Sequence, residues 1–222
     1  MIEISKIEWS NRKSLAVTVS ATGEIIVKSP VGCPMSIIEK FLIDKKSWIE
    51  SKLNKSNRMQ EKFADIINYK KLLVLGNSYF GYSSSKFKNI VLEEDRILIP
   101  SSIKHERLHK KIIKWYQNYA DNFLIPRTAK IGEMIGLKPT LIKCTGSRGR
   151  WGACNSSGEL FLNWRMIMIS PDLIDYVIVH ELAHLLELNH SPKFWSVVEN
   201  VLPDYKSRRK RLKEYDFCLK LF

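Results

Sequence analysis

The chain has 222 residues, 45% of them hydrophobic, so it can bury a core as one large domain or as a small domain beside a main one. Its formal net charge of +13 favours attraction to polyanions such as nucleic acid. The sequence has no apolar run of 18 residues and no secretion signal, so we expect a soluble cytoplasmic protein without a membrane span. The four cysteines form no C-x-x-C pair, which indicates reduced thiols rather than a disulfide framework or zinc ribbon.

The N-terminal part of the chain has the pattern of strands with one helix. Alternation of apolar and polar residues over 2–27 predicts two or three antiparallel strands. Apolar residues then recur at helical spacing over 35–55, followed by a polar link at 54–59. Strand patterns return over 72–100. We therefore expect a β-rich portion with one helix over residues 1–100.

The remainder, residues 101–222, is expected to form the main core, which makes the fold class α+β. Helical periodicity runs from Ile103 to about Ile135, with a kink or restart near Pro126. A strand and a hairpin follow over 138–164, and Ser170-Pro171-Asp172 marks the start of the next helix.

That next helix carries the most informative stretch, VIVHELAHLLELNHSPKFW at 177–195. Four residues advance a helix by about 6 Å and little more than one turn, so His180 and His184 project from one face and can share a metal ion. Glu181 lies beside the first ligand, in the general-base position of the H-E-x-x-H arrangement. A zinc ion bound by three protein groups keeps one open position and lowers the pKa of water to about 7.

The third metal ligand is predicted to be His190. On a straight helix it would lie about 15 Å along the axis from His180, so the chain must turn. Asn189 tolerates the left-handed conformation at a helix end, and Ser191 and Pro192 suit the first residues of another helix.

Two carboxylates remain rival third ligands. Glu199 could reach the ion from the following helix, and Asp204 is a weaker rival. The offset of His190 matches the metzincin pattern, but Glu187 stands where that pattern has Gly and no Met-turn follows, so the metzincin label is not justified.

Both histidine pairs of this chain could also be structural. In the apolar segment around Glu181, an unpaired carboxylate and two imidazoles would be costly, so a metal partner is the better interpretation. A second H-E-x-x-H match, HERLH at 105–109, is surrounded by Lys and Arg, and we predict that it is a solvated helix face.

Other side chains are weaker candidates for the site. Arg150 could stabilise an oxyanion or grip a carboxylate, although such an Arg is usually a surface ion-pair partner. Trp151 could bind substrate or belong to the core, and Tyr176 could support His180 or merely pack. Five other residues could likewise have a role at the site or serve only packing, ion pairing or helix capping. They are Arg148, Arg165, Cys154, Asp172 and Asp175.

The motifs SRGRWGAC and LFLNWRMIMISPDLIDYVIVHELAHLLELNHSPKFW resemble the YgjP-like family of predicted metal-dependent hydrolases, relatives of the SprT-like zinc metallopeptidases. The likeness extends over nearly the entire chain, with Ala153 where the family more often has Ser. It implies a zincin-like α+β core, one zinc ion on His180, His184 and His190, and Glu181 as the catalytic base.

The sequence therefore predicts a zinc-dependent hydrolase, foremost a metallopeptidase acting on a protein or peptide, whose backbone could add as a strand to either half of the 150–164 hairpin. One alternative is another metal-dependent hydrolase, an amidase or a nucleic-acid-associated enzyme. Another is a non-enzymatic binding module stabilised by a closed four-ligand zinc site. Basic clusters at 70–71, 104–114 and 206–213, of which the last is the densest, could bind nucleic acid or be solvated helix faces.

Overall fold

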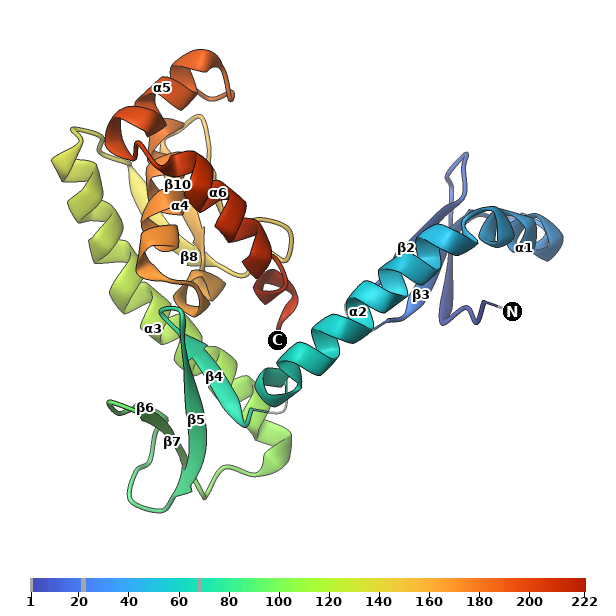
Figure 1. Ribbon diagram of the computed structural model, residues 1–222, viewed down its shortest axis with the longest axis horizontal. Coiled ribbons are helices and arrows are strands. Elements are labelled where there is room, and N and C mark those ends of the chain that lie inside the picture. The colour runs from blue at the N-terminus through green and yellow to red at the C-terminus, as the bar shows by residue number, and fades with distance from the viewer. Residues whose placement is uncertain (1, 21–22, 68) are drawn as a thin grey trace. The chain divides into compact units, whose positions relative to one another are not determined.

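A computed structural model describes the backbone of residues 2–20, 23–67 and 69–222, while the side chains at 55, 58–64, 67 and 105 are not described. The chain divides into two compact units, residues 1–67 and 68–222. Each unit combines a sheet with helices, in agreement with the expected α+β class (Figure 1). Across the described parts of the chain, no helix is both long and apolar enough to cross a membrane.

The first unit contains a three-stranded sheet. Its strands lie in the order β1 (Lys6–Ser10), β3 (Ile25–Pro30) and β2 (Ala16–Val19). β2 and β3 are antiparallel as predicted, but β1 and β3 are parallel. The difference arises because β1 pairs with the far edge of β3 and not with β2, the next strand in the sequence.

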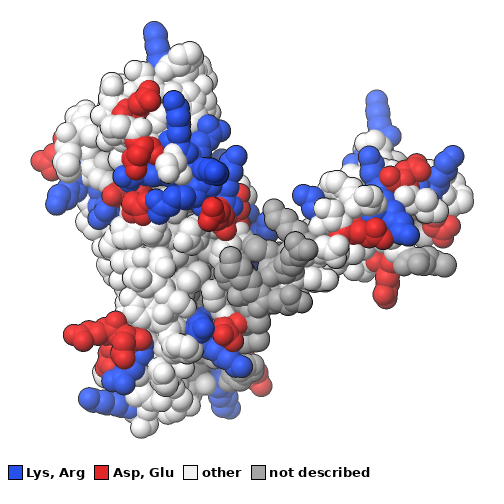
Figure 2. All heavy atoms as spheres, in the orientation of Figure 1, with Lys and Arg blue, Asp and Glu red and all other residues white. Residues whose placement is uncertain are grey.

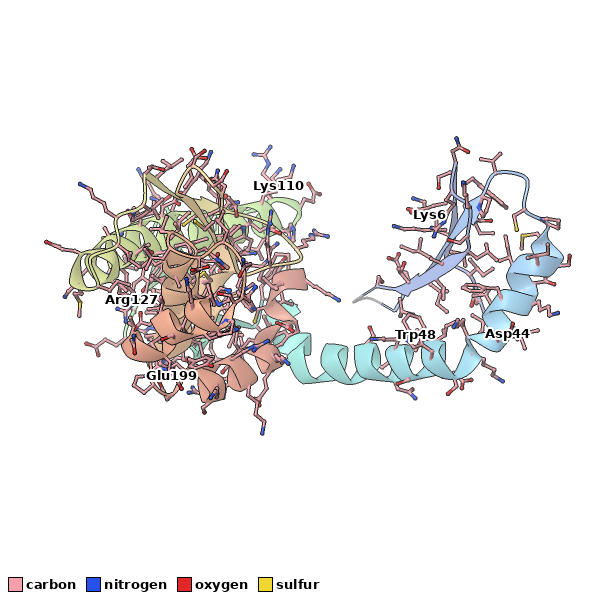
Figure 3. All side chains as sticks on the ribbon, turned by 90° about the horizontal axis from the view of Figure 1, so that it is seen from above. Lys6, Asp44, Trp48, Lys110, Arg127 and Glu199 are labelled. Carbon is pink, nitrogen blue, oxygen red and sulfur yellow. The ribbon has the colours of Figure 1, made fainter. Side chains whose placement is uncertain are left out.

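Two consecutive helices, α1 (Met35–Asp44) and α2 (Lys46–Ile67), cover this sheet. The polar link predicted at 54–59 is wrong, because those residues lie within α2. The segment contains no Gly or Pro, the two residues that most disfavour a helix interior. The core of this unit consists of Ile25, Val27, Ile38, Leu42 and Ile49. Figure 3 shows side chains from the sheet and the helices filling the space between them.

The second unit begins with a four-stranded sheet. The strands lie in the order β4 (Lys71–Val74), β5 (Asn77–Ser84), β7 (Arg96–Pro100) and β6 (Val91–Leu92). β4 and β5 form an antiparallel hairpin whose turn requires a φ of 82° at Gly76.

The long helix α3 (His105–Met134) comes next and has no break, so the predicted restart near Pro126 does not occur. Its buried residues Ile112, Tyr116 and Leu124 recur at helical spacing and hold it against the core. A second sheet then places β10 (Glu159–Asn163) between β8 (Leu141–Thr145) and β9 (Gly152–Cys154), with the predicted hairpin joining β9 to β10.

The last part of the chain is helical, and α4 lies among α3, α5 and α6 (Figure 1). The strands before α3 belong to the same unit, because the backbone N–H of Leu75 donates to the carbonyl of Ile167 and the hydroxyl of Tyr116 donates to the carbonyl of Leu73. The predicted division near residue 100 therefore lies inside this unit. The helices are η1 (Trp164–Met168), α4 (Pro171–Ala183), α5 (Pro192–Val201), α6 (Tyr205–Leu212), η2 (Lys213–Tyr215) and η3 (Cys218–Lys220).

Candidate metal centre

The candidate site is built on α4, whose ends are set by local sequence. Ser170 occupies the N-cap, and Pro171 is at the first helical position, where its missing N–H costs nothing. The helix ends at Ala183, with His184 as its C-cap, so His180 lies in the last turn and His184 directly after it.

The chain turns after His184 and brings His190 back toward α4. Ser191 caps the next helix by accepting a hydrogen bond from the N–H of Phe194, and Pro192 is its first residue, as predicted. The predicted left-handed conformation of Asn189 is wrong, because its φ is not positive. Instead its side-chain oxygen accepts a hydrogen bond from the N–H of Ser191, which forms the turn without a left-handed residue.

The turn brings three imidazoles together. One potential ligand atom from each of His180, His184 and His190 lies within 4.8 Å of the other two. The Nε2 atoms of His180 and His190 are 3.0 Å apart. The ring centroids of His184 lie 5.1 Å from His180 and 4.9 Å from His190.

The protonation of these rings suits metal binding. Burial, reinforced by the neighbouring imidazoles, lowers the pKa of His180 to about 3, and burial also lowers the pKa of His190. Both of these rings are therefore neutral at pH 7, the state in which imidazole binds a metal. Nδ1 of His184 hydrogen-bonds the carbonyl of Glu187 at 2.9 Å, which leaves its Nε2 available. Nδ1 of His180 is buried without a hydrogen-bond partner among the described residues, while Nε2 of the same ring faces Nε2 of His190. This donor set fits a divalent ion of the zinc type.

Glu181 lies beside the imidazoles with only 6% of its surface exposed. Burial raises the pKa of its carboxyl group to about 8, although the positive charge of Arg150 opposes that shift. The carboxylate also lies directly against β9. A Cβ atom added at Gly152 would come within 2.5 Å of Cγ and 2.6 Å of Oε1 of Glu181, so only glycine permits this approach.

The rival carboxylate ligands lie outside the histidine cluster. Glu199 forms an ion pair with Lys206 at 3.8 Å, and Asp204 accepts hydrogen bonds from Arg208 at 2.9 Å. Figure 3 shows Glu199 at the edge of this unit. Neither carboxylate belongs to the group that could hold a metal among the described residues.

Asp172 and Asp175, considered as supports for a ligand imidazole, also have other partners. Asp175 forms a two-bond ion pair with Arg127, and Asp172 accepts a hydrogen bond from Arg211 at 2.7 Å. Both carboxylates therefore tie α4 to neighbouring helices.

The weaker candidates lie in different surroundings. Arg150 is exposed, and its loop is held by Asn163, whose side-chain amide donates to the carbonyl of Arg150 at 2.9 Å. Trp151 is buried, and its indole N–H donates to Asp216 at 3.3 Å. Tyr176 is buried with its ring 6.0 Å from that of His180, and burial raises its pKa to about 12.

Two further candidates can be placed. Arg165 is buried and donates hydrogen bonds to the backbone carbonyls of Leu221 and Phe222, each at 2.8 Å, so it fastens the end of the described chain. Cys154 is half-buried on β9, and its pKa is raised by burial and by the charge of Glu181.

The second H-E-x-x-H stretch has no metal cluster among the described side chains. The side chain of His105 is not described. His109 is exposed and forms a hydrogen bond with the hydroxyl of Tyr69, and its ring lies 6.0 Å from that of Phe222.

Several neighbours of the imidazoles were not predicted from the sequence. The ring of Phe194 lies 4.5 to 4.9 Å from all three histidines, and Trp195 stacks against His190 at 5.6 Å. The guanidinium of Arg209 lies over Trp195 at 4.9 Å. Phe194 and Trp195 follow directly after the predicted cap at Ser191, and this position indicated that they would lie near His190. Arg209 lies in a run of basic residues, so the sequence gave no reason to choose it over its neighbours.

Comparison with known proteins gives the family context. The family model described as "YgjP-like, metallopeptidase domain" matches residues 13–215. Among solved structures, the crystal structure of the metallopeptidase zymogen of Pyrococcus abyssi abylysin is 21% identical over 40% of this chain and 91% of its own length, with a TM-score of 0.38. A TM-score of that size does not establish a shared fold. No curated protein sequence matched the chain.

Proposed function

Because this chain belongs to the YgjP-like metallopeptidase family, we propose that it hydrolyses peptide bonds at one zinc ion. The proposed ligands are His180, His184 and His190, and Glu181 is the proposed general base. The observation that carries the proposal is the cluster of three imidazoles, with ligand atoms within 4.8 Å of one another, next to a buried carboxylate.

The donor set supports an open catalytic site. Three imidazoles leave one coordination position of a tetrahedral ion for water or substrate. When bound, zinc would supply Lewis-acid polarisation of a carbonyl group and a lowered pKa for water. Closed structural sites use four protein ligands, and the cluster found among the described residues contains three.

Glu181 is proposed to move the proton. Its carboxylate would accept a proton from the attacking water and later deliver it to the leaving amine. Burial raises the pKa of this carboxyl group to about 8, and the positive charge of Arg150 opposes that rise, which favours the ionised form that a base requires. Gly152 allows the carboxylate to lie against β9, close to the backbone that we assign to substrate binding.

The proposed substrate-binding strand is β9. β10 is enclosed between β8 and β9, so it is no longer a candidate for strand addition, whereas β9 lies at the end of the sheet order. A peptide paired with the outer edge of β9 would lie beside Glu181. Arg150, on the exposed loop before β9, is the proposed contact for a developing oxyanion or a substrate carboxylate.

The test combines metal analysis with a proteome-derived peptide library, using wild type and Glu181→Gln. We expect one zinc ion per chain in both proteins and cleavage by the wild type alone. Full turnover by Glu181→Gln would rule out the proposed base.

The same experiment separates the other functions. Zinc in the wild type without cleavage of any peptide would favour another hydrolase, to be tested with amide and nucleic-acid substrates. Zinc that remains inaccessible to a small chelating inhibitor, again without cleavage, would favour a binding module.

A further inference from the structure

A basic pocket lies in the second unit, away from the residues of the metal centre. Its volume is about 590 Å³, and it is lined by the segments 88–90 and 102–104 and by α3 as far as Asn118. Five cationic residues line this basic pocket, and no Asp or Glu does. The five are Lys88, Lys104, Arg107, Lys111 and Lys114.

These five cations are free to meet a ligand. None of them forms an ion pair with the described side chains, and all are exposed. The basic helix α6 differs, because Lys206, Arg208 and Arg211 pair with carboxylates at 3.8, 2.9 and 2.7 Å. Figure 2 shows acidic residues interspersed among the basic ones on this part of the molecule. Like charges gathered in a hollow without counter-charges create a positive potential that attracts anions.

The cations form a line along α3. Arg107, Lys111 and Lys114 recur at intervals of four and three residues, so they share one face of the helix and span about 10 Å of its axis. Lys104, at the N-cap, extends the line by about one turn. A line of separated charges suits successive phosphates of a chain better than it suits a single compact anion, which needs converging donors.

The pocket also contains an aromatic ring. Trp115 is half-buried, with its ring 5.0 Å from Tyr116 and 5.7 Å from Tyr119, so neighbouring rings support it. The buried side chain of Ile90 adds an apolar surface to the lining. An indole beside a line of cations is the combination by which proteins bind single strands, through base stacking and phosphate contacts.

We propose that the basic pocket binds a single strand of nucleic acid, with Arg107, Lys111 and Lys114 on successive phosphates and Trp115 stacked on one base. A duplex does not fit this arrangement, because its bases are stacked inside the helix and cannot reach a recessed indole. The basic pocket shares no residue with the metal centre, so this proposal does not depend on the peptidase activity.

The test is fluorescence anisotropy of a labelled oligothymidylate with the full chain, at several salt concentrations. Lys111→Ala with Lys114→Ala should weaken binding by about tenfold or more and reduce the slope of log affinity against log salt by about 1.4, since each single-strand phosphate contact contributes about 0.7. The matched control, Lys206→Ala with Lys210→Ala, removes the same charge from α6 and should change affinity by less than about twofold.

The aromatic contact is tested with a second pair of variants. Trp115→Ala should weaken binding by about fivefold to a hundredfold with an unchanged salt slope, whereas Trp48→Ala, an exposed Trp in the other unit, should have no effect. Circular dichroism melting identifies any variant that fails to fold, and Trp115→Phe then replaces Trp115→Ala, with weakened but measurable binding expected.

Three results would overturn the proposal. The first is that the wild type binds no oligonucleotide at low salt. The second is that the α6 variant loses as much affinity as the α3 variant, which would indicate attraction by net charge alone. The third is that a nucleoside triphosphate or inorganic triphosphate competes as well as the oligonucleotide, which would indicate a compact phosphate site.

Discussion

The chain carries the His-Glu-x-x-His spacing twice, and the two copies lie in opposite surroundings. On α4, Glu181 is 6% exposed and the neighbouring Ile178 and Leu182 are fully buried. On α3, Glu106 and His109 are both exposed. The spacing alone places two side chains on one helix face. Burial and a third donor decide whether that face can hold a metal.

The path of the chain after each histidine pair decides whether a third donor is available. After α4 the chain turns within a few residues, and the next cap returns His190 to His180, 3.0 Å away between Nε2 atoms. α3 continues for several more turns, so no nearby residue in the sequence returns to His109. Its described neighbours are Tyr69 and Phe222, which offer a hydroxyl and a ring.

The largest expected difference between the two stretches is in metal content. His180→Ala with His184→Ala should abolish zinc binding, because one imidazole cannot hold the ion at a three-ligand site. His105→Ala with His109→Ala should keep one zinc ion per chain. Inductively coupled plasma mass spectrometry of the purified proteins measures both. Stoichiometric zinc in the first variant would overturn the assignment of the site to α4.

The two glutamates should differ nearly as much in their effect on activity. Glu181→Gln should lower kcat on a cleaved peptide by about 100- to 10,000-fold, the usual contribution of a general base. Glu106→Gln should leave kcat unchanged, because this exposed carboxylate lies outside the proposed site. Steady-state kinetics on one peptide compares the three proteins at matched zinc content. A large loss in Glu106→Gln would show that the stretch on α3 participates after all.

The predictable parts of the fold and site were those encoded by neighbouring residues. The starts of α4 and α5 lie at Ser170-Pro171 and Ser191-Pro192, because a proline at the first helical position and, at α5, the capping bond of Ser191 are local signals. The parallel pairing of β1 with β3 was not predictable, because strand alternation does not specify the partner. The close approach of Gly152 to Glu181 also joins residues far apart in the sequence. The ligands and the base themselves stay predictions until metal and activity are measured.

A smaller difference is expected in the stability of the metal-free protein. The pKa of Glu181 is about 8 in the folded chain and near 4.5 when unfolded, so between these values the folded state holds the extra proton. The free energy of unfolding therefore falls as pH rises from about 4.5 to 8, by up to a few kcal/mol. Glu181→Gln has no carboxyl group to titrate at this position, so it does not show this fall in the free energy of unfolding. The difference in stability between the variant and wild type should therefore favour the variant more at pH 8 than at pH 5.

Urea denaturation in the presence of a chelator measures this difference. The low pKa of His180 affects wild type and Glu181→Gln alike, so it cancels between them. Glu106→Gln, which makes the same substitution on the exposed face of α3, is measured alongside as the control. If the free energies of unfolding of wild type and Glu181→Gln differ by the same amount at pH 5 and pH 8, the carboxyl group of Glu181 in the wild type has an ordinary pKa.

The smallest effect is expected at the hydrogen bond of His109. Tyr69→Phe removes the hydroxyl that bonds this imidazole at the protein surface, and it should lower the free energy of unfolding by about 0.5 to 1 kcal/mol. The stacked contact of the Tyr69 ring with Phe222, at 5.5 Å between centroids, should persist in the variant. Zinc content should stay at that of the wild type. If Tyr69→Phe instead lost zinc, His109 would have to belong to a metal site, and the distinction drawn between α3 and α4 would fail.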